Sequence, residues 1–219
     1  MDSNEYNQQL INSGMLRGVD LTKLTEHWQK YYLLKIDGKC GPNTLKSLLG
    51  GATIDISEVD VLLVAEKEIG KGEDPTLGNN RGADVDRYRA GDGTNKGEGG
   101  SGSWCGSFVS FCYVEAAGGD LPFKTSRGAK RLGRNVAAAG RECDLPEPGA
   151  VIVWDRGRLK WQGHVGLCHH YDPTTDTLVT IEGNKNKRGR RFAKVGYFTY
   201  PNGLWRKKLD RIATLAQIG

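Results

Sequence analysis

Hydrophobic positions in the first fifty residues recur at the spacing of amphipathic helices. In the segment DLTKLTEHWQKYYLL, apolar and aromatic side chains follow at steps of three and four residues, at Leu21, Leu24, Trp28, Tyr31 and Tyr32. Asp20 precedes this run, where a carboxylate suits a helix N-cap. The turn-rich stretch IDGKCGPNT then leads into a further helical segment that ends in Gly50-Gly51. We therefore expect residues 1–52 to form a small all-α module followed by a short linker.

From residue 57 onward the pattern changes from helices to strands. Helical patterns occupy 57–70, 83–90, 105–117 and a part of 125–139, and a long stretch rich in Gly, Asn and Asp surrounds the second of them. After the turn signal LPEPG, short runs rich in β-branched and aromatic residues predict strands over 150–155, 164–172, 177–184, 192–200 and 204–209. Helices followed by an antiparallel sheet are typical of an α+β domain, which we expect over 57–219.

Composition adds free thiols and a positive charge to this picture. The chain has five cysteines, an odd number, and no CxxC pair. No apolar run is long enough to span a membrane, and the polar N-terminal segment lacks the pattern of a signal peptide. We therefore expect synthesis in a cytoplasm, with reduced cysteines. A formal charge of +5 suits a polyanionic partner but does not choose between nucleic acid, an anionic membrane and an acidic wall polymer.

Cys105 has the sequence setting of a nucleophile. The polar stretch SGSW ends at this cysteine, which begins an apolar helical segment. The partial positive charge of a helix N-terminus favours a thiolate, and its free N–H groups can form part of an oxyanion hole. Cys112 lies deeper in the apolar run and is expected to pack in the core. The alternative for Cys105 is a thiol that merely packs at a helix start.

His164 and two polar residues of the next strand complete a candidate triad. His164 begins an apolar strand and shares a strand face with Gly166 and Cys168, whose small side chains would leave room for a helix end or a substrate. Glu182 and Asn184 end the following strand on one face. Either can accept a hydrogen bond from a histidine N–H and so orient the imidazole. The triad therefore runs Cys, His, then Glu or Asn along the chain.

Four segments, WCGSFVSFCYVEAAG, PEPGAVIVW, GHVGLC and IEGNKN, together resemble the CHAP and NlpC-type papain-like peptidoglycan hydrolases, and most of all the CHAP-like branch common in phage endolysins. In that family a Trp-Cys at a helix start supplies the nucleophile, a Gly-His-Val strand the base, and a Glu-x-Asn or Gly-x-Asn strand end the polar partner. The matching positions are Cys105, His164 and Glu182, with Asn184 as a further site residue. The resemblance implies a papain-like fold with N-terminal helices packed on an antiparallel sheet.

The chain departs from the family pattern at two points. The usual Pro-Gly-Asp before the first strand is Pro-Gly-Ala at 148–150, which leaves the strand prediction unchanged. Some relatives bind calcium through acidic residues just before the cysteine, whereas this chain has GEGGSGSW there and carries Asp84, Asp86 and Asp92 farther upstream. We therefore expect no calcium site.

The other histidines and cysteines point to no metal centre. His169 and His170 fall at the far end of their strand and are expected at the surface. A zinc site built from Cys105, His164, Cys168 or His170 would need a closely spaced ligand pair, which this set lacks. We expect neither a metal nor a cofactor.

The N-terminal segment carries a resemblance of its own. IDGKCGPNTLKSL is similar to the DGxxGPxT signature of three-helix peptidoglycan-binding modules, although Cys40 replaces the usual aromatic or aliphatic residue. The resemblance implies a wall-binding module ahead of a wall-cutting domain.

Basic and aromatic residues add candidate contact surfaces. Lys124, Arg127, Lys130, Arg131 and Arg134 recur at helical spacing, and residues 184–194 form a denser basic run. The helical set is either a solvated face or a patch that meets an anionic wall polymer or lipid. The run over 184–194 lies directly after the predicted site, where it would dock a substrate or a phosphate-bearing polymer. Nucleic acid is not an expected partner, because no recognition module is evident. Trp104, Trp154 and Trp161 either line a sugar or peptide groove or belong to the core.

These observations favour a cysteine hydrolase that cleaves an amide bond in bacterial peptidoglycan. The cut is either that of an N-acetylmuramoyl-L-alanine amidase or that of a peptide endopeptidase, and nothing in the sequence separates the two. The alternatives are a catalytically inactive cell-wall-binding protein and an acyltransferase that uses the same triad. We expect a monomer that acts on the bacterial cell wall after release from the cytoplasm.

Overall fold

The computed structural model describes residues 25, 26, 29, 58–94, 102–119, 121–157, 159–186 and 191–215. The chain divides into two compact units, residues 1–54 and 55–219. The predicted helical module, with Cys40 and its turn signature, lies outside the described residues apart from three positions, and its nature stays a prediction. All of the helices and strands named below belong to the second unit.

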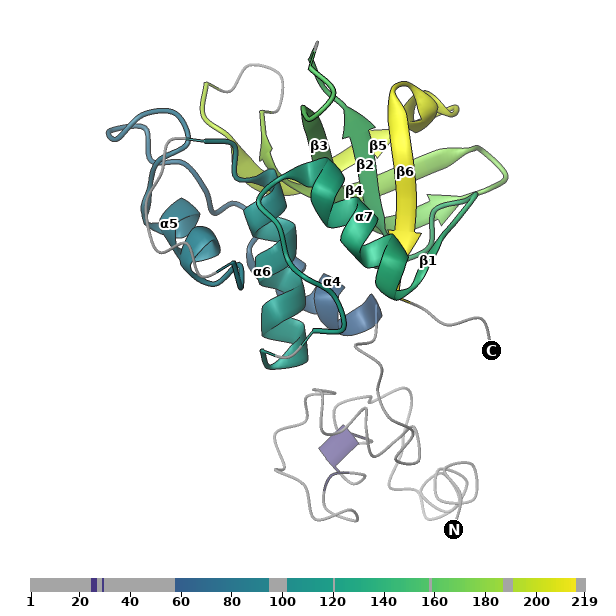
Figure 1. The fold of residues 1–219 in the computed structure, drawn as a ribbon, viewed down its shortest axis with the longest axis horizontal. Helices are drawn as coiled ribbons and strands as arrows, with labels where there is room; N and C mark the ends of the chain where they lie inside the picture. Colours follow the sequence, from purple (N-terminus) through teal and green to yellow (C-terminus); the bar gives the residue numbers. More distant parts are fainter. Residues whose placement is uncertain are drawn as a thin grey trace. The chain divides into compact units, whose positions relative to one another are not determined.

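The described part of the second unit has four helices followed by a six-stranded antiparallel sheet (Figure 1). The helices are α4 (Glu58–Lys67), α5 (Ala83–Ala90), α6 (Cys105–Ala117) and α7 (Ala129–Ala139). The strands are β1 (Arg141–Glu142), β2 (Val151–Asp155), β3 (Gly163–Asp172), β4 (Thr177–Lys185), β5 (Lys194–Tyr200) and β6 (Leu209–Thr214), in the spatial order β1-β6-β2-β3-β4-β5. This architecture confirms the predicted α+β, papain-like fold.

The strand predicted over 204–209 is wrong. Residues Leu204–Arg206 form a short 3-10 helix, and the last strand begins only at Leu209. Gly203 and Lys208 both adopt positive φ, at 71° and 61°, so the chain turns on each side of the 3-10 helix. Between these turns Trp205 is buried, and its Nε1 donates to Asp176 Oδ1 at 3.0 Å. The apolar residues of this segment therefore anchor a turn instead of pairing as a strand.

Side chains alternate between the two faces of the sheet, and each face packs a core of its own. One face packs against α4, α6 and α7, and α6 and α7 lie over it in Figure 1. Its buried residues include Val151, Val153, Val165, Leu167 and Ile181. The opposite face packs with Trp205, through Ile152, Trp154, Cys168, Leu178 and Ile212. Because Val165 points toward the helices, the adjacent His164 lies on the opposite face, beside Trp154.

Helix α6 is the central helix of the domain. Its residues from 105 to 113 are all buried, because α4, α5, α7 and the sheet all contact it. Such an apolar sequence on every side is typical of a helix enclosed by a core. Cys112 is fully buried within it, as expected. The helix ends at Gly118, whose φ of 69° is the left-handed conformation that favours glycine at this position.

Two carboxylates, the buried Glu73 and the partly exposed Asp84, connect the long segment before α6 to the rest of the domain. Glu73 is 1% exposed and accepts N–H groups from Asn80 at 3.0 Å, Ala193 at 2.8 Å and the Trp104 indole at 3.1 Å. Asp84 Oδ2 accepts the Gly72 N–H at 2.9 Å. These bonds tie segments that are far apart in the sequence to the residue that precedes Cys105.

Candidate active site

Cys105 lies at the start of α6, against a neighbouring chain segment. Trp104 occupies the N-cap and makes no side-chain capping bond, so it leaves the first N–H groups of the helix to other acceptors. A Cβ at Gly106 would lie 2.3 Å from the Arg127 carbonyl oxygen, so only glycine admits this close approach. The Ser103 hydroxyl lies 3.5 Å from the Cys105 Sγ. The thiol is thus fixed at the positive end of a buried helix.

His164 lies between the thiol and a buried carboxylate. Its Nε2 is 2.6 Å from Glu182 Oε2, and both side chains are almost fully buried. The other ring nitrogen, Nδ1, is therefore the one available to the thiol, and the hydrogen bond between Cys105 and His164 lowers the pKa of the thiol. Trp154 stacks beside the imidazole, with ring centroids 6.1 Å apart. The structure thus brings three of the predicted site residues together.

The absence of a side chain at Gly166 leaves room for the side chain of Glu182. Pairing of Leu167 with Ile181 places Gly166 opposite Glu182 on the neighbouring strand. A Cβ at Gly166 would lie only 2.5 Å from the Glu182 Cγ. The room predicted for a helix end or a substrate is therefore filled by the side chain that contacts the imidazole, and this part of the prediction is wrong.

Glu182 also has three partners that the sequence did not reveal. Its Oε1 accepts the Thr180 hydroxyl at 2.6 Å and the Tyr200 hydroxyl at 2.5 Å. The Lys185 ammonium lies 3.1 Å from Oε1 and 3.0 Å from Oε2. Strand alternation placed Thr180 on the same face as Glu182, which was the available signal. The other two depend on strand pairing and on the irregular register after Glu182.

The pKa values of the three groups are shifted toward a charged site. Burial would raise the pKa of Glu182, but His164 and Lys185 outweigh it and lower the pKa to about 2. Burial would lower the pKa of His164, but hydrogen bonds with Cys105 and Glu182 raise it to about 9. Burial would raise the pKa of Cys105, but the His164 hydrogen bond and charge lower it to about 7. A thiolate beside an imidazolium is therefore the favoured form between these two values.

Asn184 contacts the site by another route. Its Nδ2 donates to the Ser103 hydroxyl, which in turn lies beside the Cys105 sulfur. Its φ of 56° falls where the register of β4 with β5 is irregular, between Glu182 and Lys185. Of the two candidates for contact with the imidazole, Glu182 makes that contact, and Asn184 reaches the thiol side of the site through Ser103.

Arg156 is a further residue of the site that sequence reasoning missed. It is exposed, follows directly after β2, and its NH1 lies 3.2 Å from His164 Nδ1. Nothing in the local pattern distinguishes it from other loop arginines, because its position depends on the pairing of β2 with β3. Its positive charge stands beside the nitrogen that serves the thiol.

The other candidate residues lie outside this group. His169 is partly exposed and its Nε2 contacts Glu66 at 3.1 Å, and His170 is exposed, both as expected of surface residues. Asp92 pairs with Arg127 at 2.7 Å. Among the described residues, no group of three His, Cys, Asp or Glu side chains is placed to hold a metal ion.

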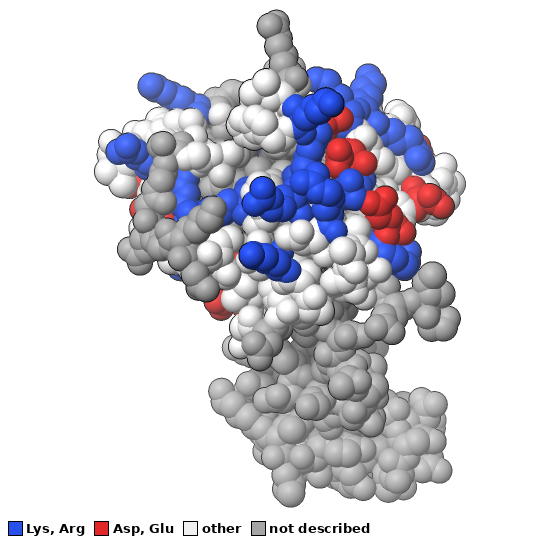
Figure 2. All heavy atoms as spheres, viewed as in Figure 1, with Lys and Arg blue, Asp and Glu red and all other residues white. Residues whose placement is uncertain are grey.

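Some of the aromatic and basic residues predicted to form contact surfaces are buried, and others are exposed to solvent. Trp104 is fully buried in the core, Trp154 packs beside the imidazole, and Trp161 is 72% exposed. Lysine and arginine side chains gather on the face that carries α7 (Figure 2). Of the predicted basic set, Lys124, Arg131 and Arg134 are exposed. No helix in the described part of the chain is both long and apolar enough to cross a membrane.

Comparison with known proteins agrees with this geometry. The family model of the CHAP domain matches residues 96–184. The matched stretch begins before Cys105, contains His164 and Glu182, and ends at Asn184. Searches of curated proteins and of solved structures found no match. Residues 96–184 of this chain are therefore similar to a CHAP domain, over less than half of the chain.

Proposed function

We propose that this protein is a cysteine hydrolase that cleaves an amide bond in bacterial peptidoglycan, either the bond between N-acetylmuramic acid and L-alanine or a bond within the peptide. The observation that carries the proposal is the contact of one imidazole with two groups. Nε2 of His164 bonds the buried Glu182, while the Cys105 thiol, with its pKa lowered to about 7, bonds the same ring. The CHAP match over 96–184 points to the same class of substrate.

The geometry supports attack by Cys105. The thiolate sulfur bonds to the carbonyl carbon, and the carbonyl electron pair moves to oxygen. Backbone N–H groups at the start of α6 hold the resulting oxyanion. Collapse of this intermediate breaks the carbon–nitrogen bond, and the proton on His164 Nδ1 passes to the leaving amine. The product is an acyl-enzyme joined through sulfur.

Water completes the cycle. Nδ1 of His164, now unprotonated, takes a proton from water as the oxygen attacks the thioester carbon. The carbon–sulfur bond breaks, the carboxylic acid product leaves, and the thiolate–imidazolium pair is restored. Throughout both steps Glu182 holds the ring through Nε2 and stabilises its charged form.

Two further parts of the chain fit this role as proposals. Residues 1–52 carry the DGKCGPNT signature and would hold the enzyme on peptidoglycan. The exposed side chains Lys124, Arg131 and Arg134 on and near α7 would add attraction to an anionic wall polymer or lipid. The enzyme would act as a monomer, in the manner of an endolysin, after release from the cytoplasm in which it is made.

Isolated cell walls provide the test. Wild type is expected to lower the turbidity of a wall suspension and to free new amino termini, and mass spectrometry of the fragments identifies the bond. Cys105→Ala should abolish both effects, whereas Cys112→Ala, on the same helix but in the core, should keep them. Circular dichroism checks that both variants fold. If wild type frees no new termini, or if Cys105→Ala frees them equally well, the proposal is wrong.

A further inference from the structure

Arg156 stands on a rigid base at the edge of the site. Asp155, the residue before it, pairs with Gly163 at the end of the β2–β3 ladder. The Arg156 N–H donates to the Gln162 carbonyl at 3.2 Å, and the Gln162 side chain accepts the Leu159 N–H at 3.1 Å. Only the side chain of Arg156 is therefore free to reorient, and it is exposed to solvent.

The charge of Arg156 lacks an acidic partner within the described part of the chain. The adjacent carboxylate, Asp155, pairs with Lys130 instead. The carboxylate of Glu182 is buried and already contacts four side chains. Lys185 is a second cation near Arg156. Burial lowers the pKa of Lys185, and the nearby positive charge of Arg156 lowers it further. The edge of the site therefore carries an excess of positive charge.

The contact between Arg156 and His164 excludes the reactive form of the site. A guanidinium only donates hydrogen bonds, so Nδ1 can accept from Arg156 only when it carries no proton. In the thiolate–imidazolium form Nδ1 is protonated and donates to Cys105, so Arg156 loses its acceptor. The guanidinium must then turn away from the ring, and it becomes available to an anion beside the site.

We propose that Arg156 binds a carboxylate of the peptide substrate near the scissile amide bond and thereby determines specificity. The inference rests on the proposed function, since peptidoglycan stem peptides carry free carboxylates close to their amide bonds. The planar guanidinium suits a carboxylate because it can donate two parallel hydrogen bonds. A carboxamide at the same place offers one acceptor and no charge, so the pair discriminates between free and amidated peptides.

Matched substrates test this inference. Muramyl peptides are prepared in which each free carboxylate in turn is replaced by its carboxamide, and kcat/KM is measured for each pair. Wild type is expected to prefer one carboxylate peptide over its carboxamide by about 10- to 100-fold, the range of a charge-assisted hydrogen bond. Arg156→Gln should lose this preference because it slows the carboxylate peptide more than the carboxamide peptide, and Arg156→Lys should recover a part of the preference.

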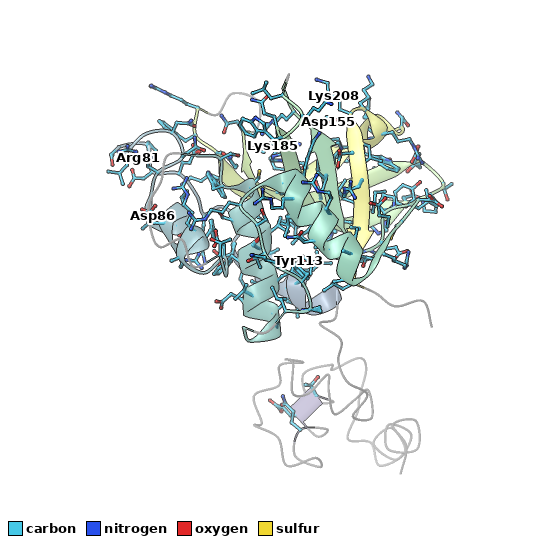
Figure 3. All side chains as sticks on the ribbon, viewed as in Figure 1. Arg81, Asp86, Tyr113, Asp155, Lys185 and Lys208 are labelled. Atoms are coloured by element: carbon cyan, nitrogen blue, oxygen red, sulfur yellow. The ribbon has the colours of Figure 1, made fainter. Side chains whose placement is uncertain are left out.

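A distant arginine provides the control. Figure 3 shows Arg81 on the side of the domain that carries Asp86, apart from Asp155 and Lys185 at the site. Arg81 is exposed, as Arg156 is, so Arg81→Gln removes the same charge and should leave the preference unchanged. If Arg156→Gln slows both peptides of a pair equally, or if wild type distinguishes no pair, the inference is overturned.

Binding separates this inference from the proposed reaction. Calorimetry with Cys105→Ala measures the affinity for the same peptide pairs without turnover. A preference for the carboxylate peptide that disappears in Cys105→Ala/Arg156→Gln supports the carboxylate site even if wild type hydrolyses neither peptide, in which case the proposed hydrolysis alone fails. A preference that persists in the double variant, or that is absent from Cys105→Ala, overturns the role of Arg156 whatever the activity.

Discussion

Replacement of Glu182 by glutamine removes one charge from the site and keeps the shape of the side chain. The pKa of Cys105 is lowered to about 7 and that of His164 is raised to about 9, so the ion pair is the favoured form between these values. A neutral amide at 2.6 Å from Nε2 forfeits about 1.5–3 kcal/mol of charge-assisted bonding to the imidazolium. We therefore expect kcat/KM to fall by about 10- to 100-fold.

The pH profile distinguishes this loss from a general disturbance. Activity requires a deprotonated thiol and a protonated imidazole, so the rate rises as pH passes about 7 and falls as pH passes about 9. Without the carboxylate the pKa of His164 drops, and the alkaline limb should move down by about 1–2 pH units. The measurement is the initial rate of wall hydrolysis between pH 5 and 10.

A second histidine–glutamate pair supplies the control. Glu66 contacts His169 at 3.1 Å, but both side chains are about a third exposed or more. Glu66→Gln should therefore leave the profile of wild type unchanged. Tyr200→Phe removes a donor to Glu182 and keeps the charge, so its alkaline limb should stay near that of wild type even if Glu182→Gln folds poorly. If the alkaline limb of folded Glu182→Gln stays near pH 9 with a rate within about threefold of wild type, the assigned role is wrong.

Three other changes probe the site and its frame. Gly166→Ala places a Cβ 2.5 Å from Glu182 Cγ, so it should displace the carboxylate and reduce wall hydrolysis by at least tenfold, a result that unchanged hydrolysis would contradict. Arg127→Met leaves Asp92 buried without its cation, so urea denaturation should show a loss of about 3 kcal/mol, and a loss below about 1 kcal/mol would refute this account. Alkylation of Cys105 by iodoacetamide, followed by mass spectrometry, should accelerate as pH rises through about 7, whereas a midpoint above pH 8 would contradict the lowered pKa.

Local sequence signals predicted most of the fold because they coincide with the tertiary structure. The apolar run that begins at Cys105 and ends at Gly118 is a helix over the predicted residues, since a left-handed glycine stops it. Strands β2 to β5 agree with their predicted ranges to within two residues, because β-branched residues fill both buried faces. The segment around Trp205 could not be predicted in this way. Its conformation depends on the distant Asp176 and on two turns of positive φ.

The site was predictable where its residues carry a local signature. Cys105 begins α6, His164 is the second residue of β3 and Glu182 lies in the second half of β4, and the resemblance to the CHAP family named the same three. Arg156 and Tyr200 carry no such signature. Tyr200 lies on β5 and contacts Glu182 on the neighbouring β4, and Arg156 follows β2 and contacts His164 on the neighbouring β3. Both contacts therefore depend on the register in which the strands pair.

The bonds of Glu73 also bear on how the domain is assembled during synthesis. Its carboxylate is buried only when the indole of Trp104 and the N–H of Ala193 have both arrived, and these partners lie 31 and 120 residues away along the chain. A nascent chain that has not yet released Ala193 from the ribosome leaves this carboxylate solvated and the residue before Cys105 without its anchor. The residue before Cys105 therefore gains this anchor only late in translation.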